Sequence, residues 1–263
     1  MVQVSIILLL ISSLFDIDVQ KSIVSDVPPS YPFFDTTNVT SAYIMGKFDP
    51  ASHPDFRLIP KKYADQKGRF IRKDVFEAYK KMYHAAKKDG VHLIIISATR
   101  NFDAQKKIWE DKWTGKRLLE GGIHAQRDIP DPKKRALKIL EYSSMPGTSR
   151  HHWGTDIDLN ALNNEYFEKG EGMKVITWLL KNSASYGFCM TYTKFDPQRT
   201  TGYQPEKWHW SYTPVSAPLT HWAKRNIKDT MITGFEGSET ATEIKVVQNY
   251  ISGIHPSCLP SPN

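Results

Sequence analysis

Cysteine is scarce in this sequence: Cys189 and Cys258 are the two cysteines among 263 residues. Two are too few for a disulfide-rich scaffold or for a zinc site built from thiolates. In an exported protein the two could pair with each other. Cys189 could equally be a small buried hydrophobic residue. The sequence leaves both interpretations open.

Long hydrophobic runs are also missing. The first residues, MVQVSIILLLISSLF, contain an apolar run of roughly a dozen residues, shorter than the ~20 needed to span a bilayer. Its length suits the apolar core of a secretory signal peptide, although no Lys or Arg precedes it and no A-x-A site follows. We therefore predict a signal peptide over residues 1–20, export to the periplasm or cell envelope, and no stable membrane span in the mature chain. A buried terminal helix or strand is the alternative.

The sequence has neither a basic stripe nor a low-complexity tract. The net charge is +7, but Lys and Arg are spread along the whole chain, which argues against nucleic-acid binding. Charge spread in this way indicates a solvated surface that would suit an anionic cell envelope. The length favours one substantial core, and we expect a monomer.

Local patterns divide the chain into segments. Residues 21–65 are Pro-rich and weakly periodic, so we expect an extended lead-in that wraps the domain. The main domain is expected over 66–227, and a helical extension packed on it over 228–263. Apolar periodicity and end signals such as Pro132 predict helices at about 71–89, 103–113, 132–144, 172–185, 216–227 and 240–251.

Short apolar or alternating runs between these helices predict strands. VHLIIIS at 91–97 is apolar and β-branched, DIDLNAL at 156–162 alternates, and FCMTYT at 188–193 follows a glycine. Short strands mixed with helices, without an internal repeat, predict an α+β fold. We expect a single small antiparallel sheet flanked by helices.

The segment SRHHWGTDID at 149–158 concentrates two imidazoles and two carboxylates around a glycine. Because side chains alternate along a strand, Asp156 and Asp158 are expected on the same face. Zn²⁺ favours imidazole together with carboxylate, and a catalytic zinc site needs three protein ligands and an open position for water. The segment therefore predicts part of a metal site, for which His151 and His152 are both candidate ligands.

A third ligand would come from EKWH at 206–209, which places Glu206 three residues before His209. If His209 binds the metal, Glu206 can lie beside the bound water and take its proton. Residues three apart in a regular strand face opposite ways. We therefore expect a bend or a helical turn here, to which Pro205 contributes.

Three separated motifs follow one another along the chain: Ser-x-x-Arg-x-x-x-x-Gln at 97–105, Ser-x-His-x-x-Gly-x-Asp-x-Asp at 149–158 and Glu-x-Trp-His at 206–209. Together they resemble the VanY-type D-alanyl-D-alanine carboxypeptidases of the M15 family of zinc peptidases, which have the Hedgehog/DD-peptidase fold. Three motifs in the right order are more specific than any one of them. The resemblance spans about residues 70–213 and implies that the main domain is a zinc peptidase domain.

The resemblance implies one zinc ion. Its ligands would be His151, Asp158 and His209, and Glu206 would be the catalytic base. The register of the motif selects His151 as the ligand over His152, which we expect near the rim of the cleft.

The resemblance also implies residues that contact the substrate. Arg100 would hold the terminal carboxylate, a task that suits the planar guanidinium. Gln105 and Ser149 would lie in the substrate pocket, and Tyr212 matches an aromatic position just after the last zinc ligand. Asp156 departs from the family pattern, in which this position is usually small. It could orient a ligand histidine, contact the substrate, or make a hydrogen bond at the end of the strand.

These residues predict a zinc metallopeptidase that acts on peptidoglycan stem peptides, as a D-alanyl-D-alanine carboxypeptidase that releases the C-terminal D-amino acid. An endopeptidase or an L,D-carboxypeptidase with the same zinc site is one alternative. A non-catalytic zinc-containing module that binds the cell wall is another. Glu206 argues against this module, because a purely structural zinc site has no use for a base.

Overall fold

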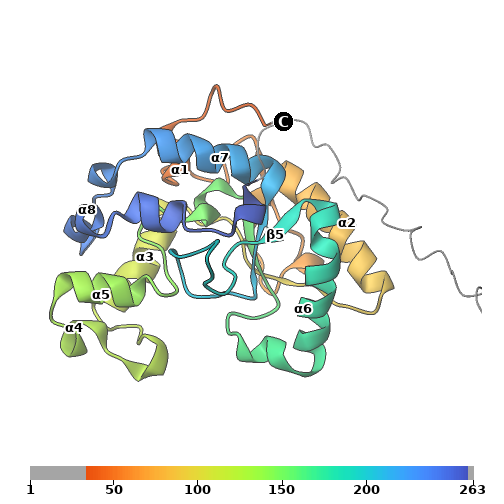
Figure 1. Cartoon of the computed structure of the whole chain (residues 1–263). Coiled ribbons are helices and arrows are strands. Elements are labelled where there is room, and N and C mark those ends of the chain that lie inside the picture. The colour runs from red at the N-terminus through yellow and green to blue at the C-terminus, as the bar shows by residue number, and fades with distance from the viewer. Residues whose placement is uncertain (1–33, 260–263) are drawn as a thin grey trace, which may run out of the picture.

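The computed structural model of the chain describes residues 34–259 (Figure 1). The predicted signal peptide at 1–20 and the first part of the predicted lead-in lie outside the described residues. The helices are α1 Ser41–Ile44, α2 Lys73–Lys88, α3 Phe102–Trp113, α4 Ala125–Asp128, α5 Pro132–Ile139, α6 Gly170–Asn182, α7 Thr213–Asn226 and α8 Ala241–Ile244. The strands are β1 Phe56–Leu58, β2 Phe70–Arg72, β3 Ile95–Ser97, β4 Asp156–Leu159, β5 Phe188–Met190 and β6 His209–Tyr212. Within residues 34–259 no helix has the length and apolar character that crossing a membrane requires.

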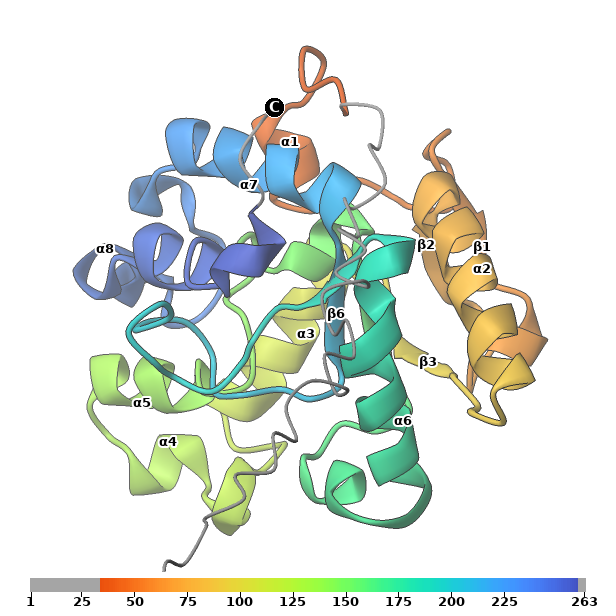
Figure 2. The same cartoon turned by 45° about the vertical axis from the view of Figure 1, so that its right-hand side comes forward.

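A four-stranded antiparallel sheet lies at the centre of the fold, in the order β3–β4–β6–β5. Helices α2 and α6 lie on one side of it and α3 and α5 on the other (Figure 2). A separate antiparallel pair joins β1 to β2. The predicted α+β class and the small antiparallel sheet are confirmed. The β1–β2 pair was not predicted, and its strand β1 lies within the predicted lead-in.

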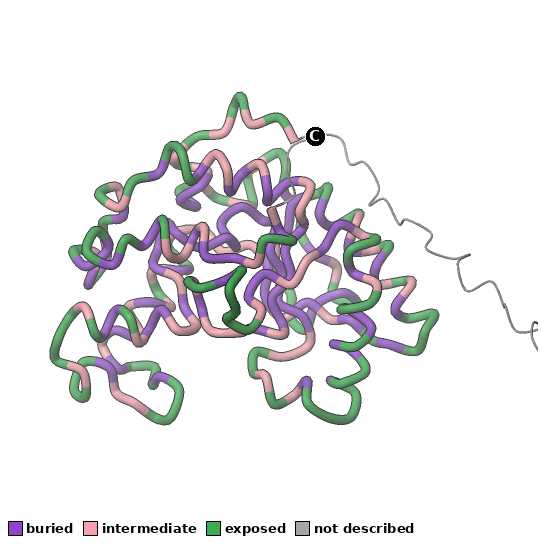
Figure 3. The backbone as a smooth tube through the Cα atoms, viewed as in Figure 1, coloured by how far each residue is buried: buried purple, intermediate pink, exposed green. Residues whose placement is uncertain are grey.

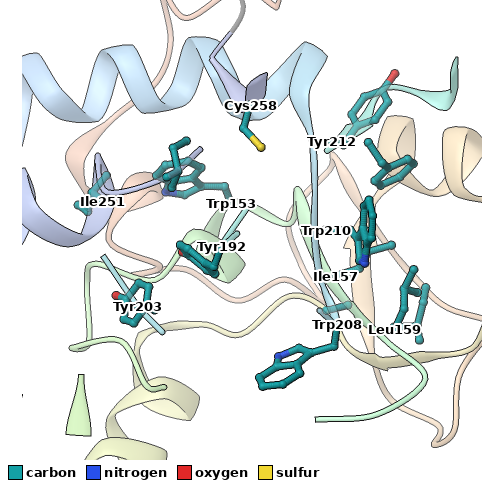
Figure 4. Close-up of a cluster of buried hydrophobic side chains, with 14 of the residues drawn as sticks. Trp153, Ile157, Leu159, Tyr192, Tyr203, Trp208, Trp210, Tyr212, Ile251 and Cys258 are labelled. Carbon is teal, nitrogen blue, oxygen red and sulfur yellow. The ribbon is translucent and has the colours of Figure 1, made fainter. Parts of the chain in front are cut away.

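Strands β4 and β6 are buried on both faces. Figure 3 shows the buried backbone concentrated where these strands run. On one face Ile157, Leu159 and Trp210 gather in the hydrophobic core (Figure 4). The alternate positions of β4, Asp156 and Asp158, point to the other face, as the period of a strand requires. The sheet therefore carries polar side chains into the interior, where they must bind one another or a ligand.

Helix α2 shows how the sequence sets the ends of an element. Its buried side chains recur at three- and four-residue spacing and are those of Val75, Phe76, Tyr79, Met82 and Ala86. Gly90 then adopts φ +75°, and the next amide, that of Val91, donates to the carbonyl of Ala86. This left-handed glycine satisfies the last turn and ends the helix.

The segment after α7 packs against the same core, through buried Ile232, Ile251 and Cys258 among others. The helix predicted at 240–251 is interrupted, because Lys245 adopts φ +53° after α8, and a π-helix follows at Val247–Ile251. The predicted boundaries of the domains, at residues 66 and 227, stay predictions.

A disulfide joins Cys189 to Cys258, with the two Cα atoms 5.6 Å apart. Cys189 belongs to β5 and Cys258 to the C-terminal segment. The sequence left open whether the two cysteines pair or Cys189 is a free buried residue, and in the structure they pair. The bond ties the end of the described chain to the edge strand of the central sheet.

Reduction of this disulfide should lower the free energy of unfolding by about 2–4 kcal/mol, because the bond restricts the unfolded chain between residues 69 positions apart. Urea unfolding followed by tryptophan fluorescence, with and without dithiothreitol, measures the effect. A Cys189→Ala/Cys258→Ala variant is the control, since its midpoint should not respond to the reductant. Equal midpoints for oxidised and reduced wild type would contradict the expectation.

Candidate metal centre

The pairing of β4 with β6 brings two of the predicted ligands together, because Asp158 lies directly opposite His209 in the register. The third, His151, lies in a short 3-10 helix, Arg150–Trp153, just before β4. Gly154 turns the chain from this helix into the strand with φ +73°, and a Cβ there would lie 2.4 Å from the ring of Phe56. Local turn and sheet register together therefore place the three side chains on one face.

The side chains of His151, Asp158 and His209 form a group whose ligand atoms all lie within 4.8 Å of one another, and all three residues are buried. His151 Nε2 is 3.4 Å from Asp158 Oδ2, and His209 Nδ1 is 3.3 Å from Asp158 Oδ1. Tetrahedral zinc with ligand bonds of about 2.0–2.2 Å separates its ligands by roughly 3.3–3.6 Å. Asp158 Oδ1 is buried without a hydrogen bond among the described residues. These residues fit a metal ion.

Hydrogen bonds fix which ring nitrogen each histidine presents. His151 Nδ1 lies 2.8 Å from the carbonyl oxygen of Ala98, so it donates there and leaves Nε2 with a lone pair. His209 Nε2 lies 2.8 Å from Asp156 Oδ2, which leaves Nδ1 toward Asp158. These protons are assigned from their partners. Partners of this kind orient metal-bound histidines and raise their basicity.

Asp156 lies behind His209 and does not line the cavity. Its Oδ2 also accepts from Arg150 Nε at 3.0 Å, and its Oδ1 accepts from the hydroxyls of Thr155 and Ser211. Burial alone would raise the pKa of Asp156, but Arg150 and His209 outweigh it and hold this pKa below its usual value. Of the three roles left open, this geometry matches two: orientation of a histidine and hydrogen bonding at the end of the strand. It does not match a substrate contact, since both oxygens are engaged in the interior.

Glu206 lies beside the candidate ligands, with Oε2 3.2 Å from His209 Nδ1. The amide of His209 donates to the carbonyl of Glu206 at 3.3 Å, so the backbone forms the bend that the sequence predicted. Burial raises the pKa of the Glu206 carboxyl, although His209 acts in the opposite direction. For His209, burial alone would lower the pKa, but the hydrogen bond to Asp156 and the nearby carboxylates of Asp158 and Glu206 raise it well above its usual value. The same negative surroundings favour a metal cation.

A cavity of about 510 Å³ is lined by the three candidate ligands, Glu206 and Arg100. Arg100 Nε donates to Gln105 Oε1 at 2.9 Å, and its Nη1 donates to Ser97 Oγ at 2.6 Å. Gln105 in turn donates to the carbonyl of Ser144. Gln105 therefore holds the guanidinium in place, and Arg100 faces the cavity.

The remaining predicted residues divide between the cavity and the core. Ser149 lines the cavity, and its hydroxyl is buried without a hydrogen bond among the described residues. Tyr212 does not line the cavity: its ring packs 5.3 Å from that of Phe188 in the core. This differs from the expected substrate contact, because Tyr212 and Trp210 share the apolar face of β6 (Figure 4).

His152 is fully buried, not at the rim of the cleft as expected. Its Nδ1 donates to the carbonyl of Arg100 at 2.7 Å, and its Nε2 accepts from the amide of Gly147 at 3.0 Å. Burial lowers the pKa of His152 to about 3, so the ring is neutral. With both nitrogens engaged, His152 connects the loop after β3 to the 3-10 helix and has no nitrogen for a metal.

Sequence reasoning missed Arg150 and Tyr192. Arg150 sits inside the predicted metal motif, but its partners Ser211 and Thr220 come from β6 and α7. Tyr192 lines the cavity, and its ring centroid lies 4.7 Å from that of His209. Its place depends on the pairing of β5 with β6, which no local pattern reveals.

Buried histidine and aspartate ligands on a small antiparallel sheet, with a carboxylate beside them, are the features of a metallopeptidase site. The model of the family described as VanY, D-alanyl-D-alanine carboxypeptidase, matches residues 68–215, which is more than half of the chain. The chain therefore belongs to the VanY family. The resemblance inferred from the three motifs is confirmed.

Two curated relatives match over the same region. Protein YodJ of Bacillus subtilis (strain 168) is 31% identical over 152 residues, which are 57% of this chain and 48% of YodJ. A D-alanyl-D-alanine carboxypeptidase of Enterococcus faecalis (strain V583) is 29% identical over 136 residues, which are 52% of this chain and 46% of that protein. The chain thus spans about half the length of these relatives.

Solved structures are also similar. That of the LdcB LD-carboxypeptidase shares 22% identity, with a TM-score of 0.46 over 77% of this chain and 79% of its own. The structure of VanYB in complex with D-alanine-D-alanine shares 24% identity, with a TM-score of 0.45 over 76% of this chain and 88% of VanYB.

Asp156→Asn should weaken the binding of Zn²⁺, used as a probe ion, by about 10–100-fold, because the neutral amide cannot hold His209 as a carboxylate does. Chelator competition measures the affinity, and circular dichroism checks the fold. Ser216→Ala is the matched control: Ser216 Oγ accepts from Ser211, and within residues 34–259 no side-chain hydrogen bond joins it to Asp156 or His209. Equal affinity of the folded Asp156→Asn variant and wild type would refute the role given to Asp156.

Proposed function

We propose that this chain is an exported zinc metallopeptidase that removes the C-terminal D-amino acid from peptidoglycan stem peptides. One observation carries the proposal. A His–Asp–His group with both histidine tautomers fixed shares its cavity with a buried carboxylate, Glu206, and a guanidinium, Arg100. Membership of the VanY family supports the same reaction.

Zn²⁺ is the ion that we infer for this site. Two imidazoles and one carboxylate, His151, His209 and Asp158, are a ligand set that zinc takes in catalytic sites, with a position left for water or substrate. When bound, zinc supplies Lewis-acid activation of water and of the peptide carbonyl. The buried Asp158 oxygen without a hydrogen bond supports a single ion at this place.

Glu206 is the proposed general base. It would take the proton from the attacking water and deliver it to the leaving amine. Its burial raises the pKa of the carboxyl toward the operating pH, which favours both transfers. The turn at 206–209 keeps Glu206 beside His209 Nδ1.

Arg100 is the residue proposed to bind the terminal carboxylate of the substrate. Ser97 and Gln105 hold the guanidinium through Nη1 and Nε, so its orientation is set before a substrate arrives. A planar, permanently charged guanidinium suits a carboxylate. Selection for a free C-terminus makes a carboxypeptidase the favoured reaction. Ser149 would complete this pocket with its buried hydroxyl.

Export to the cell envelope and removal of residues 1–20 are also proposals. The disulfide between Cys189 and Cys258 supports them, because such bonds persist in oxidising compartments. The peptidase domain would comprise residues 66–227, and the chain would act as a monomer on stem peptides.

Purified muropeptides are the decisive substrate. Incubation with the protein should release one C-terminal D-alanine from pentapeptide stems, and a chelator should abolish the release while added Zn²⁺ restores it. Mass spectrometry identifies the product. Loss of D-alanine from tetrapeptide stems would indicate an L,D-carboxypeptidase, and cleavage inside stems or crosslinks an endopeptidase. Bound zinc without turnover of any muropeptide would indicate a binding module.

Glu206→Gln should lower kcat by about 10²–10⁴-fold, the usual worth of a positioned proton-transfer group. Zinc content should remain, because Glu206 is not among the three candidate ligands. The matched control is Glu168→Gln, which removes a carboxylate that is 63% exposed and lies outside the cavity lining. Full activity of the zinc-loaded Glu206→Gln variant would exclude Glu206 as the base.

A further inference from the structure

Helix α3 presents one side to the cavity. Gln105, Ile108 and Lys112 all line it, and their spacing of three and four residues places them on one face of the helix. Gln105 holds Arg100 at one end of this face. Lys112 lies seven residues further along, an axial rise of about 10 Å. The cavity lining thus has, besides Arg100, a lysine at the other end of this helix face.

Lys112 is unusually placed for a lysine, because only 3% of the residue is exposed. Its ion pair is with Glu120, whose Oε1 lies 3.6 Å from Nζ, longer than the ~2.7–2.9 Å of a charge-assisted hydrogen bond. Taking an ammonium out of water is unfavourable unless a well-made ion pair offsets the lost hydration. The side chain of Glu120 is 48% exposed, so water screens its charge.

The other cations near this end of the cavity are engaged or solvated. Arg69 makes two hydrogen bonds to Asp65, so its charge is already balanced. Arg117 lines the cavity but is exposed. Of these three cations, Lys112 is therefore the buried one, and its ammonium makes few hydrogen bonds to the described residues. A buried donor of this kind, facing a cavity, fits an anionic group of a ligand.

Another segment that lines the cavity is polar as well. Asn163, Asn164 and Glu165 line it from the segment before α6, whereas Lys112 comes from α3 and Glu120 from the 3-10 helix Glu120–Gly122 that precedes α4. In Figure 1, α4 and α5 lie in the lower left and α6 in the lower right. A peptide in this cavity would meet two amide groups and the Glu165 carboxylate from one segment and the Lys112 ammonium from another.

We propose that Lys112 forms a carboxylate subsite, which selects substrates that carry a second negative charge upstream of the C-terminus. The inference rests on the proposed function, with the terminal carboxylate at Arg100. An extended peptide lying along α3 advances about 3.3 Å per residue, so the rise of about 10 Å from Gln105, which holds Arg100, to Lys112 corresponds to roughly three residues. The second carboxylate would belong to the third or fourth residue from the C-terminus. Glu120 occupies the place beside Lys112 until the ligand carboxylate binds there.

The test uses N-acetylated pentapeptides ending in D-Ala-D-Ala, with a free side carboxylate on the third residue from the C-terminus, on the fourth, or on neither because both are amidated. We expect zinc-loaded wild type to hydrolyse one of the acids with a kcat/KM about 10–100-fold above that of the diamide, the range for a hydrogen bond to a charged group. Lys112→Met should bring this ratio close to one. Methionine keeps the length of the side chain without an ammonium to bury, so the fold should be retained.

Lys107→Met is the matched control, because Lys107 lies on the exposed side of the same helix, with a side chain 68% exposed. Its ratio should equal that of wild type. A wild type that does not distinguish acids from the diamide, or a Lys112→Met variant that still does, would overturn the proposal.

Failure of the proposed function has a different signature. If wild type hydrolyses none of the peptides, the carboxypeptidase assignment fails, and binding still tests Lys112. Calorimetry with the zinc-loaded Glu206→Gln protein, alone and combined with Lys112→Met, gives the Kd values of the acids and the diamide. A preference for one acid that Lys112→Met abolishes would support the subsite without turnover. Equal affinities for all three peptides would overturn it.

Discussion

The buried ion pair between Arg150 and Asp156 is the interaction on which the metal centre depends. An ionised carboxylate without solvent is stable only when its charge is paired and its oxygens accept hydrogen bonds. Arg150 supplies the charge at 3.0 Å, and the hydroxyls of Thr155 and Ser211 supply further donors. Asp156 can then accept from His209 as a full carboxylate. The nitrogen that His209 presents to the metal site is therefore set by an arginine outside the ligand group.

The need to pair the buried charges of Arg150 and Asp156 also affects how the helices pack. Strand β4 has no exposed face, so each polar side chain on it needs a partner from another element. Arg150 Nη2 donates to Ser211 on β6 and its Nη1 to Thr220 on α7, the helix that follows β6 directly. Helix α7 is therefore part of the support of the site as well as a cover for the sheet. Its Thr220 hydroxyl also donates back to the carbonyl of Ser216 in the preceding turn.

Features set by local periodicity were predictable, and those set by long-range pairing were not. Alternation along β4 placed Asp156 and Asp158 on one face, and the register with β6 agrees. The bend at 206–209 followed from the chemistry required of Glu206. By contrast, the two hydroxyl partners of Arg150, on Ser211 and Thr220, lie 61 and 70 residues away in sequence, and no local pattern indicates them.

The different roles of two adjacent histidines could not be predicted from the local sequence either. His151 and His152 are identical in type, but only the backbone groups around each ring decide their roles. The carbonyl of Ala98 leaves His151 one free nitrogen, whereas the carbonyl of Arg100 and the amide of Gly147 leave His152 none. Sequence motifs identify the chemistry at such a site, but the tautomer depends on contacts that form only in the folded chain.

The C-terminal segment lies beyond the region that the VanY family model matches, yet it contacts the loop that carries the proposed base. The amide of His255 donates to the carbonyl of Thr191. The backbone of Gly253 also packs closely against Gly202, because a Cβ on Gly202 would lie 2.0 Å from the Gly253 carbonyl oxygen. The disulfide anchors this segment to β5, just before the loop. Because a catalytic carboxylate must keep its position to within a fraction of an ångström, on the order of 0.5 Å, a loop needs such outside support. The extension therefore contributes to the site without lining it, by restricting the loop between β5 and β6 from which Glu206 reaches the ligands.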